Sequence, residues 1–572
     1  MSNISWKLKK PVRERLAKER GTVFKDPGGR VRVCLVYPNV YSLGMTNLGF
    51  LTAYHLFNSL DNCVAERAFL PDAASLQEYE KSSTPLFTYE SQTPVASFDI
   101  IAFSLPFEED YKNLPLLFDL IGLPISSSER RAIDSPLILA GGVAVSLNPV
   151  PLANFFDIFH IGEGEGSVER LVHAFAASQG QKKADVLRAF DEIESVYCPS
   201  LYEYEYDGAI IKEMRPVAGA KKKVTAAKNL SLDGFPIPQS FIVTPDTEFR
   251  DTYLAEIERG CPRGCRFCAA GFLYLPPRWR DAKEVRDTVA KGISITGKAG
   301  LVGTAVSEYP WIKETVQAGI DAGGSMTLSS LRMDMLDAPF MELLKKGGYQ
   351  TVTLAPEAGS ERLRKVVNKG LTNADILETA RLVSEAGFIK IKLYFLIGLP
   401  TETDADVEAI VDIVAAIKGV VKKGQVSLSI NPFVPKPVTP FQWHRFEDAK
   451  ILDRRFDIIK RGLSKMSGVI IKNMSAKEAA GQAYLSRADA RADRFILDIA
   501  GHGLRPAMRS GAGLIEESIY RERPKDELLP WDFIDHGVKR AYLWKEYQKG
   551  LEGRTTPPCV LGACFRCGVC VE

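Results

Sequence analysis

Runs of consecutive apolar residues, each followed by a glycine- or proline-containing turn and a helical pattern, recur along most of this chain. The segments 31–39 (VRVCLVYPN), 98–107 (FDIIAFSLPF) and 135–149 (SPLILAGGVAVSLNP) have this form, and 155–175 ends a run in a glycine turn that opens a helix. A strand that is apolar on both faces must be covered on both, so the pattern predicts a parallel sheet between helices. Ligands of such sheets bind at the carboxyl ends of the strands, where these turns lie.

A second series of the same kind begins near residue 253. Amphipathic helical stretches such as 404–419 separate its candidate strands. The spacing is roughly 25–45 residues, the size of one β-α unit. Six units predict a partial barrel, because a full eight-unit barrel needs more chain. The candidate strands are 253–258, 299–306, 325–331, 351–356, 389–398 and 425–431.

With 572 residues the chain is too long for one hydrophobic core, so we expect several domains. The fold class is α/β: an N-terminal doubly wound, Rossmann-like domain, a partial (βα)6 TIM-type barrel and a mostly helical C-terminal region. The stretch 201–214 is typical of a β-hairpin and 215–238 of a linker. The predicted boundaries are 1–28 (basic arm), 29–195 (Rossmann-like domain), 196–245 (hairpin and linker), 246–445 (barrel), 446–550 (helical region) and 551–572 (cysteine tail).

Charge and hydropathy say little about partners. The formal net charge is +2, which favours no particular ligand. No run of about 18 apolar residues could span a bilayer, and the first residues lack an apolar signal core, so we expect a cytoplasmic protein without a membrane partner. The basic stretch 7–20 could touch RNA, but Glu14 and Glu19 interrupt it, and a solvated helix face is the simpler interpretation.

Ten cysteines in a cytoplasmic chain are more typical of metal ligands or buried thiols than of disulfides. Three are scattered among apolar neighbours and fit small core residues. The other seven form two clusters that random placement would not produce. The scattered cysteines are Cys34, Cys63 and Cys198; the clusters are Cys261, Cys265 and Cys268, and Cys559, Cys564, Cys567 and Cys570.

The first cluster, spaced C-x-x-x-C-x-x-C, predicts a metal site with one open position. Thiolates suit zinc and iron–sulfur clusters, but a structural zinc site wants four ligands and only three are local. The loop follows the first barrel strand, at the mouth where such barrels build active sites. Three thiolates on a four-iron cluster leave one iron free for chemistry. A partial zinc site or a chance grouping is the alternative.

With Phe267 before its last cysteine, this motif after a first barrel strand resembles the radical S-adenosylmethionine (SAM) superfamily. The resemblance implies that Cys261, Cys265 and Cys268 hold a 4Fe–4S cluster. Its open iron would chelate the amino and carboxylate groups of SAM, and reduction would cleave SAM to a 5′-deoxyadenosyl radical.

Further motifs follow in the order of that family and imply SAM contacts. Gly398 and Pro400 resemble the adenine-contacting segment, where a glycine lets backbone approach a flat ligand. Glu357 and Ser360 resemble the residues that reach the ribose or methionine end, with Arg364 a further candidate. Ser360 also fits an N-cap of the helix that follows, and the two roles are compatible.

One segment departs from the family pattern. A Gly-Gly-Glu segment often follows the second strand and holds the methionine amino group, but 303–310 reads GTAVSEYP. Gly303 lies at its start, and Ser307, Glu308 or backbone carbonyls would have to make this contact.

A doubly wound domain before such a barrel resembles the cobalamin-binding subgroup of the family. The turns YPNVYSLGM, SLPFEED, LAGGVAVSLNP and IGEGEGS match the order of its loops. No D-x-H-x-x-G motif is present, so that motif offers no histidine to cobalt, whose lower face would be free or weakly held. A vestigial domain that binds nothing is the alternative. The implied cobalamin contacts are Tyr41, Ser42, Gly44, Met45, Leu105, Gly141, Gly142, Glu163 and Gly164.

The four cysteines of the tail are spaced C-x-x-x-x-C-x-x-C-x-x-C within 559–570. Four thiolates can close a zinc site or hold a second iron–sulfur cluster, and we favour the cluster. The resemblance covers most of the chain and reaches an uncharacterised bacterial group of cobalamin-domain radical enzymes.

The whole pattern predicts a radical SAM enzyme that uses cobalamin to methylate an unactivated carbon. A methylthiotransferase-like enzyme acting on RNA and a radical rearrangement enzyme with a passive cobalamin domain are the alternatives within the class. A regulatory module with structural or redox-sensing clusters is a third, which an open three-cysteine site disfavours. The reductant would be a flavodoxin or ferredoxin, and the substrate, a small molecule or RNA, is not readable from the sequence.

Overall fold

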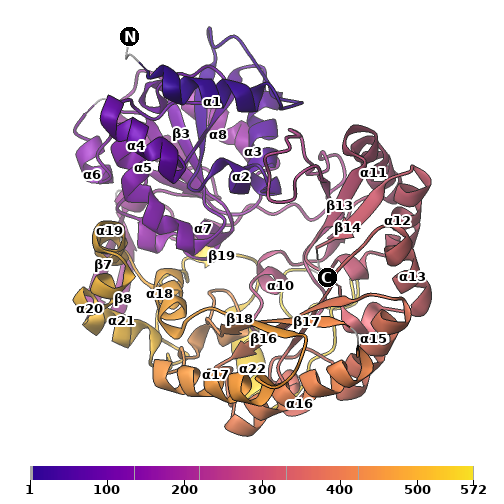
Figure 1. The fold of residues 1–572 in the computed structure, drawn as a ribbon. Helices are drawn as coiled ribbons and strands as arrows, with labels where there is room; N and C mark the ends of the chain where they lie inside the picture. Colours follow the sequence, from indigo (N-terminus) through magenta and orange to yellow (C-terminus); the bar gives the residue numbers. More distant parts are fainter. Residues whose placement is uncertain (1–3, 134, 218, 330, 423, 571–572) are drawn as a thin grey trace.

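The computed structural model describes residues 4–133, 135–217, 219–329, 331–422 and 424–570. Figure 1 shows two α/β units side by side, with the last part of the chain running back between them. The N-terminal unit lies at the upper left and the barrel-type unit at the right and below. This arrangement confirms the predicted fold class.

The N-terminal unit is built on one six-stranded sheet in the order β2-β1-β3-β4-β5-β6. Every pair is parallel except β5 and β6. The chain reverses its direction of winding between β1 and β3, and ligands of doubly wound sheets bind at such a point. The strands are β1 (Val31–Tyr37), β2 (Cys63–Phe69), β3 (Ile100–Ser104), β4 (Leu137–Gly141), β5 (Ile158–His160) and β6 (Val196–Tyr197).

Helices cover this sheet, and several of them bury an apolar stripe. In α3, Asn47 caps the first turn by accepting a hydrogen bond from the Phe50 N–H, and Phe50, Leu51, Tyr54 and Phe57 are buried. The scattered cysteines Cys34, Cys63 and Cys198 are fully buried, as expected. The helices are α1 (Trp6–Leu16), α2 (Tyr41–Gly44), α3 (Leu48–Ser59), α4 (Ala73–Ser82), α5 (Leu114–Ile121), α6 (Ser127–Arg130), α7 (Val143–Leu147), α8 (Ser167–Ala177) and α9 (Lys183–Asp191).

The barrel-type unit contains two parallel sheets, β10-β13-β14 and β15-β16-β17-β18. Its strands are β10 (Tyr253–Glu256), β13 (Lys298–Val302), β14 (Ser325–Leu328), β15 (Val352–Glu357), β16 (Lys390–Ile397), β17 (Gln425–Pro432) and β18 (Val469–Asn473). Its helices are α10 (Ala270–Leu273), α11 (Ala282–Thr296), α12 (Ile312–Asp321), α13 (Ala338–Lys346), α14 (Glu361–Val366), α15 (Asn373–Glu385) and α16 (Asp404–Val420).

Three strands, β18, β9 (Val224–Thr225) and β19 (Ile534–Asp535), lie where the sequence predicted none. The six expected barrel strands are present, and β18 extends the series into the region 446–550, which we expected to be helical. The stretch 215–238 is more than a linker, because β9 in it pairs with β19 from the far end of the chain. The hairpin prediction is confirmed by β7 (Tyr202–Asp207) and β8 (Ile210–Pro216).

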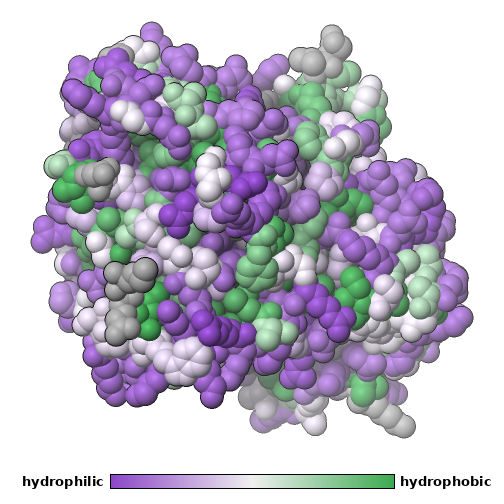
Figure 2. All heavy atoms as spheres, turned by 90° about the horizontal axis from the view of Figure 1, so that it is seen from above, coloured by the Kyte–Doolittle hydropathy of each residue, from purple (hydrophilic) through white to green (hydrophobic). Residues whose placement is uncertain are grey.

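The rest of the C-terminal region is helical, as expected, and packs against both units. No helix among the described residues has the length and apolar character needed to cross a bilayer. The face in Figure 2 is mostly hydrophilic, with small apolar areas between the charged side chains. The helices are α17 (Ala449–Leu463), α18 (Ala476–Arg487), α19 (Ala492–His502), α20 (Leu504–Ser510), α21 (Ala512–Ile519) and α22 (Arg540–Leu551).

Candidate active site

The first three-cysteine cluster lies in one loop that follows β10. A short antiparallel pair, β11 (Glu258–Arg259) and β12 (Arg278–Trp279), closes the loop at its base. Gly260 directly after β11 has a φ of 88°, and a Cβ there would lie 2.4 Å from the Tyr274 carbonyl oxygen, so glycine is required. This turn sets the start of the segment that carries Cys261, Cys265 and Cys268.

The three thiols lie close together in a part of the loop that is shielded from solvent. Burial raises the pKa of Cys261 to about 12, although the Arg263 N–H donates a hydrogen bond to its sulfur. The thiols of Cys265 and Cys268 add to that rise, so the sulfur atoms are near one another. Burial likewise raises the pKa of Cys268 to about 11. Such thiols stay protonated at neutral pH unless a cation favours the thiolates, and bound metal supplies that charge.

The four-cysteine tail lies directly on this loop. The Cys559 N–H donates a hydrogen bond to the Pro262 carbonyl oxygen at 2.7 Å, and the Arg266 guanidinium donates one to the Arg554 carbonyl oxygen at 2.7 Å. Burial raises the pKa of the Cys559 thiol, and the other tail thiols raise it further. The two cysteine groups are therefore neighbours in space, near α10 in Figure 1. The other tail thiols are those of Cys564, Cys567 and Cys570.

Within the described residues, no three His, Cys, Asp or Glu side chains are grouped so as to hold a single metal ion.

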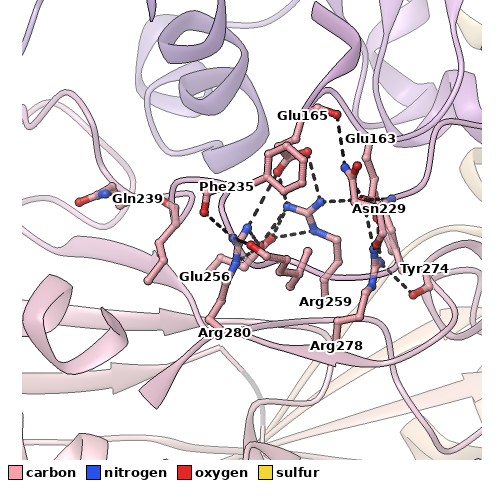
Figure 3. A network of polar contacts seen from close by, with 12 residues as sticks. Glu163, Glu165, Asn229, Phe235, Gln239, Glu256, Arg259, Tyr274, Arg278 and Arg280 are labelled. Carbon is pink, nitrogen blue, oxygen red and sulfur yellow. Dashed lines mark hydrogen bonds and ion pairs between the residues drawn. The ribbon is translucent and has the colours of Figure 1, made fainter. Parts of the chain in front are cut away.

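A buried set of ion pairs, which we call the interunit clamp, ties the N-terminal unit to the base of the cysteine loop (Figure 3). Arg259 pairs with Glu165 at 2.7 Å and with Glu163 at 3.2 Å, and Arg278 pairs with Glu163 at 2.8 Å. At most 11% of any of these four side chains is exposed. Burial acts to raise the pKa of Glu165, but Arg259 outweighs it and holds this pKa below its usual value.

No sequence motif marks this clamp. Its arginines and carboxylates lie about a hundred positions apart, although Arg278 and Arg280, two residues apart in PPRWRD, share one side of an extended segment. Arg280 completes the arrangement by pairing with Glu256 at 2.9 Å. Removing one partner of such a buried pair typically costs about 3–5 kcal/mol, so the clamp holds the two units in a fixed relation.

A cavity of about 510 Å³ lies between the units, beside the clamp. On one side it is bounded by β1, β3, β4 and β5 near their carboxyl ends, together with α3 and α8. On the other side, Leu273 and Tyr274 of the cysteine loop and Glu258 form the wall. The cavity thus joins the switch point of the N-terminal sheet to the cysteine loop, and sites of this kind bind ligands.

Two buried histidines that no motif marks, His160 at the end of β5 and His536 after β19, also line the cavity. Lys228 lies beside them, and burial lowers its pKa to about 8. Neither histidine belongs to a D-x-H-x-x-G motif, so the absence of that motif did not exclude imidazoles from this place.

The segment that replaces the Gly-Gly-Glu pattern lies partly at this cavity. Gly303 lines it, and a Cβ there would lie 2.3 Å from Glu258 Oε1, so the residue must be small. Ser307 is buried, and its Oγ accepts a hydrogen bond from the Arg332 N–H at 2.9 Å. Glu308 pairs with Arg332 at 3.3 Å. The two side chains expected to hold the SAM amino group are therefore engaged within the protein.

Of the predicted methionine- or ribose-end residues, Glu357 lies near the cysteines. Its charge raises the pKa of Cys268, it has a φ of 68°, and it pairs with Lys369 at 3.2 Å. Ser360 caps α14 by accepting a hydrogen bond from the Leu363 N–H at 3.1 Å, which confirms its capping role. Its contact with SAM stays a prediction.

The predicted adenine segment does not reach the cavity. Gly398 has a φ of 82°, and a Cβ there would lie 2.8 Å from a Leu452 methyl carbon, so packing against α17 already accounts for the glycine. Pro400 is buried in the next turn, and Phe267 packs half-buried against the core. None of the three lines the 510 Å³ cavity.

The predicted cobalamin contacts divide into two groups. Gly141, Gly142, Glu163 and Gly164 line the cavity, and a Cβ on Gly142 would lie 2.5 Å from the carbonyl oxygen of the fully buried Leu105.

The second group, in the turn after β1, does not line this cavity, and its contact with cobalamin stays a prediction. Tyr41 donates a hydrogen bond to Glu19, and Tyr41 and Ser42 line a separate cavity of about 420 Å³ next to α1. Gly44 packs on Phe69, and the Met45 sulfur accepts from Arg67. The N-terminal arm folds onto this turn, because Glu19 forms a buried ion pair with Arg67.

Two family models match the chain: radical SAM proteins, N-terminal, over residues 49–199, and the radical SAM superfamily over residues 256–414. A relative in Methanocaldococcus jannaschii, uncharacterized protein MJ0966, is 30% identical over 466 residues, which are 81% of this chain and 90% of the relative. The chain therefore belongs to the radical SAM superfamily of enzymes.

Two other similarities are more distant. A tRNA-2-methylthio-N(6)-dimethylallyladenosine synthase of a Ruegeria species is 24% identical over 294 residues, covering 47% of this chain and 62% of the relative. The structure of the radical SAM methyltransferase TsrM from Kitasatospora setae, with cobalamin and a [4Fe-4S] cluster bound, aligns with a TM-score of 0.44 and 14% identity over 85% of this chain and 98% of that one. At that TM-score the likeness does not define what this chain binds.

Proposed function

We propose that this radical SAM enzyme uses the thiolates of Cys261, Cys265 and Cys268 to hold a 4Fe–4S cluster. The observation that carries the proposal is the position of their loop, which lies on a common cavity with the switch point of the N-terminal sheet. In a cluster each thiolate binds its own iron, and three thiolates leave a fourth iron free. When bound and reduced, such a cluster supplies the electron that cleaves SAM to a 5′-deoxyadenosyl radical.

The protein's own residues would orient the reactants and exclude water. Leu273 and Tyr274 form an apolar wall next to the cysteines, and the clamp keeps that wall facing the N-terminal unit. Lys369 places a positive charge beside Cys268 and acts to lower the pKa of that thiol, against the larger effect of burial. Glu357, paired with Lys369, lies within reach of a cationic group of SAM bound near the cysteines.

We further propose that the N-terminal unit holds cobalamin in this cavity and that the overall reaction methylates an unactivated carbon. The apolar floor between the sheet, α3 and α8, and the backbone turns at Gly142 and Gly162, fit a large flat ligand at the switch point. When bound, methylcobalamin supplies the methyl group. The protein contributes placement and exclusion of water.

A second candidate function is methylthiolation of RNA. The similarity to the Ruegeria synthase over 294 residues favours it, and the tail cysteines would then hold a second cluster. For those cysteines we propose an iron–sulfur cluster over a closed zinc site, because Cys559 is bonded to the first cysteine loop and both groups would be assembled together. A radical rearrangement with a passive N-terminal unit is the third candidate.

Anaerobic reconstitution separates these functions. The full chain is loaded with iron, sulfide and cobalamin, then reduced by flavodoxin or dithionite with SAM present. Visible absorbance reports bound corrin, and mass spectrometry reports the products of SAM. Bound corrin with both 5′-deoxyadenosine and S-adenosylhomocysteine supports the methyltransferase, whereas zinc at the three cysteines or intact SAM would contradict the proposal.

A further inference from the structure

His536 is a buried imidazole for which the described residues provide no hydrogen-bond partner. Its residue is 5% exposed, and neither ring nitrogen has a partner in hydrogen-bond geometry. Buried polar atoms are nearly always paired, and each unpaired one costs roughly 1–3 kcal/mol. The Ser146 backbone carbonyl lies near this ring, so at least one ring nitrogen is left without a protein partner, which points to a ligand.

The ring is neutral and can donate a lone pair. Burial, followed by the charge of Lys228, lowers the pKa of His536 to about 3, so the imidazole carries no proton on one nitrogen at neutral pH. The backbone carbonyl of Ser146 lies close enough to the ring to oppose this shift. A histidine that binds metal commonly directs its other N–H to a backbone carbonyl, which fixes the tautomer.

The fold brings His536 to the cavity from outside the N-terminal unit. β19 pairs with β9, and the Lys228 ammonium donates a hydrogen bond to the His536 carbonyl oxygen at 2.7 Å. The residue lies on the same cavity as Gly142 and Gly162, whose turns end β4 and precede α8. The backbone of His536 is thus held from two sides, and the residue lines the cavity.

His160 is a less suitable candidate and serves as the matched control. It also lines the cavity, is 7% exposed and has an unpaired Nε2. Its ring, however, lies near Arg170 and Glu165, toward α8, and only one of its nitrogens is orphaned. A variant at His160 removes a buried imidazole from the same cavity without touching His536.

We propose that His536 supplies an axial nitrogen ligand to the cobalt of cobalamin bound in this cavity. The inference rests on the cobalamin part of the proposed function and goes beyond it, since it assigns the metal a protein ligand outside the N-terminal unit. The imidazole would take the place that a histidine of the missing D-x-H-x-x-G motif would occupy.

Electron paramagnetic resonance of the full chain loaded with cob(II)alamin tests this directly. An axial ¹⁴N ligand splits the cobalt signal into triplets, and an ¹⁵N ligand splits it into doublets. Protein grown with ¹⁵N-histidine should therefore show doublets where unlabelled protein shows triplets. Triplets in the labelled protein would mean that the cofactor's own base is the ligand, and no nitrogen splitting would mean that none is bound; both overturn the inference.

Variants identify the residue. His536→Ala should abolish the doublets while corrin still binds, and His160→Ala should retain them. If His536→Ala folds poorly, ¹⁵N-imidazole is added to the unlabelled variant. It should occupy the space left by the missing side chain, stabilise the fold and restore the doublets. Doublets that survive in His536→Ala but vanish in His160→Ala would overturn the assignment. A wild-type protein that takes up no corrin at all would instead contradict the proposed function, and visible absorbance distinguishes that failure.

Discussion

The two cysteine groups touch each other, yet their surroundings differ. The first group has three thiols in a loop held at its base by β11 and β12 and by the interunit clamp, beside the cavity. The second has four thiols on a tail whose flanking side chains are exposed, with Val560 at 61% and Phe565 at 37%. We expect the first group, with three thiols beside the cavity, to leave a coordination position open. The second has four thiols, enough to close a site, and exposed side chains flank it.

From this difference we expect the first cysteine group to take part in the reaction and the second to have a supporting role. An open metal position is useful only where water is excluded and a substrate can be positioned, which the first group's place provides. The second group touches the first through Cys559 and Pro262, so it can influence that loop without lining the cavity as the wall residues do.

The largest expected effect comes from removing one of the first three ligands. Cys265→Ala should lower SAM cleavage by at least about 1,000-fold, equivalent to about 4 kcal/mol of activation barrier, because the metal centre is lost. Product formation under dithionite measures it. The matched control is Cys34→Ala, a buried core thiol that should leave iron content and cleavage unchanged. If Cys265→Ala cleaved SAM as fast as the wild-type protein, the first cysteine group would not be the site of SAM cleavage, and the proposed difference between the two groups would be wrong.

Breaking the clamp should come next. Arg259→Ala leaves Glu165 buried without its main partner and Glu163 with Arg278 alone, which costs about 3–5 kcal/mol and lowers the thermal midpoint of the full chain. Arg259→Lys keeps the charge but loses the two-pronged geometry, so it should recover part of the loss. An unchanged midpoint in Arg259→Ala would mean that the units are held together elsewhere.

A smaller effect is expected from the tail. Cys567→Ser should reduce bound iron by about half, because one of two four-iron clusters is lost, and should leave most dithionite-driven SAM cleavage intact. Iron and zinc analysis with the cleavage assay measures both. Zinc in place of iron in the wild-type tail would assign it a structural site, and complete loss of cleavage would merge the two groups into one functional unit.

The smallest effect concerns Glu258 in the cavity wall, whose pKa burial raises from 4.5 to about 7. The folded state then holds an extra proton between those values, so the unfolding free energy falls by up to about 3 kcal/mol as pH rises through that window and is flat above it. Glu258→Gln should flatten this dependence. Thermal midpoints of metal-free protein at about pH 5 and about pH 8 test it, and an equally steep dependence in the variant would rule it out.

The parallel series could be predicted because strands such as Leu137–Gly141 and Lys390–Ile397 are strongly apolar and end in glycine turns. β18 could not, since VIIKN is short and its side chains are partly exposed, which does not distinguish a strand from a helix end. The β9–β19 pairing joins residues more than three hundred positions apart, and no local pattern encodes it.

In the candidate site, too, only features encoded by a local sequence pattern could be predicted. Cysteine spacing was enough to predict a candidate metal-binding loop, because ligand chemistry is local. The clamp and His536 depend on contacts between distant segments, and a lone histidine carries no motif. Gly398 shows that a glycine pattern has more than one cause: its positive φ and its packing on Leu452 also require glycine there, and its contact with SAM stays a prediction.

The central claim is that three thiolates leave one iron open to SAM at the cavity. Electron–nuclear double resonance on the reduced full chain, with SAM labelled with ¹⁵N at the methionine amino group, tests it most directly. We expect a ¹⁵N coupling to the reduced cluster in wild-type protein and in Cys567→Ser. A reduced cluster at these cysteines that shows no coupling to the label would contradict it.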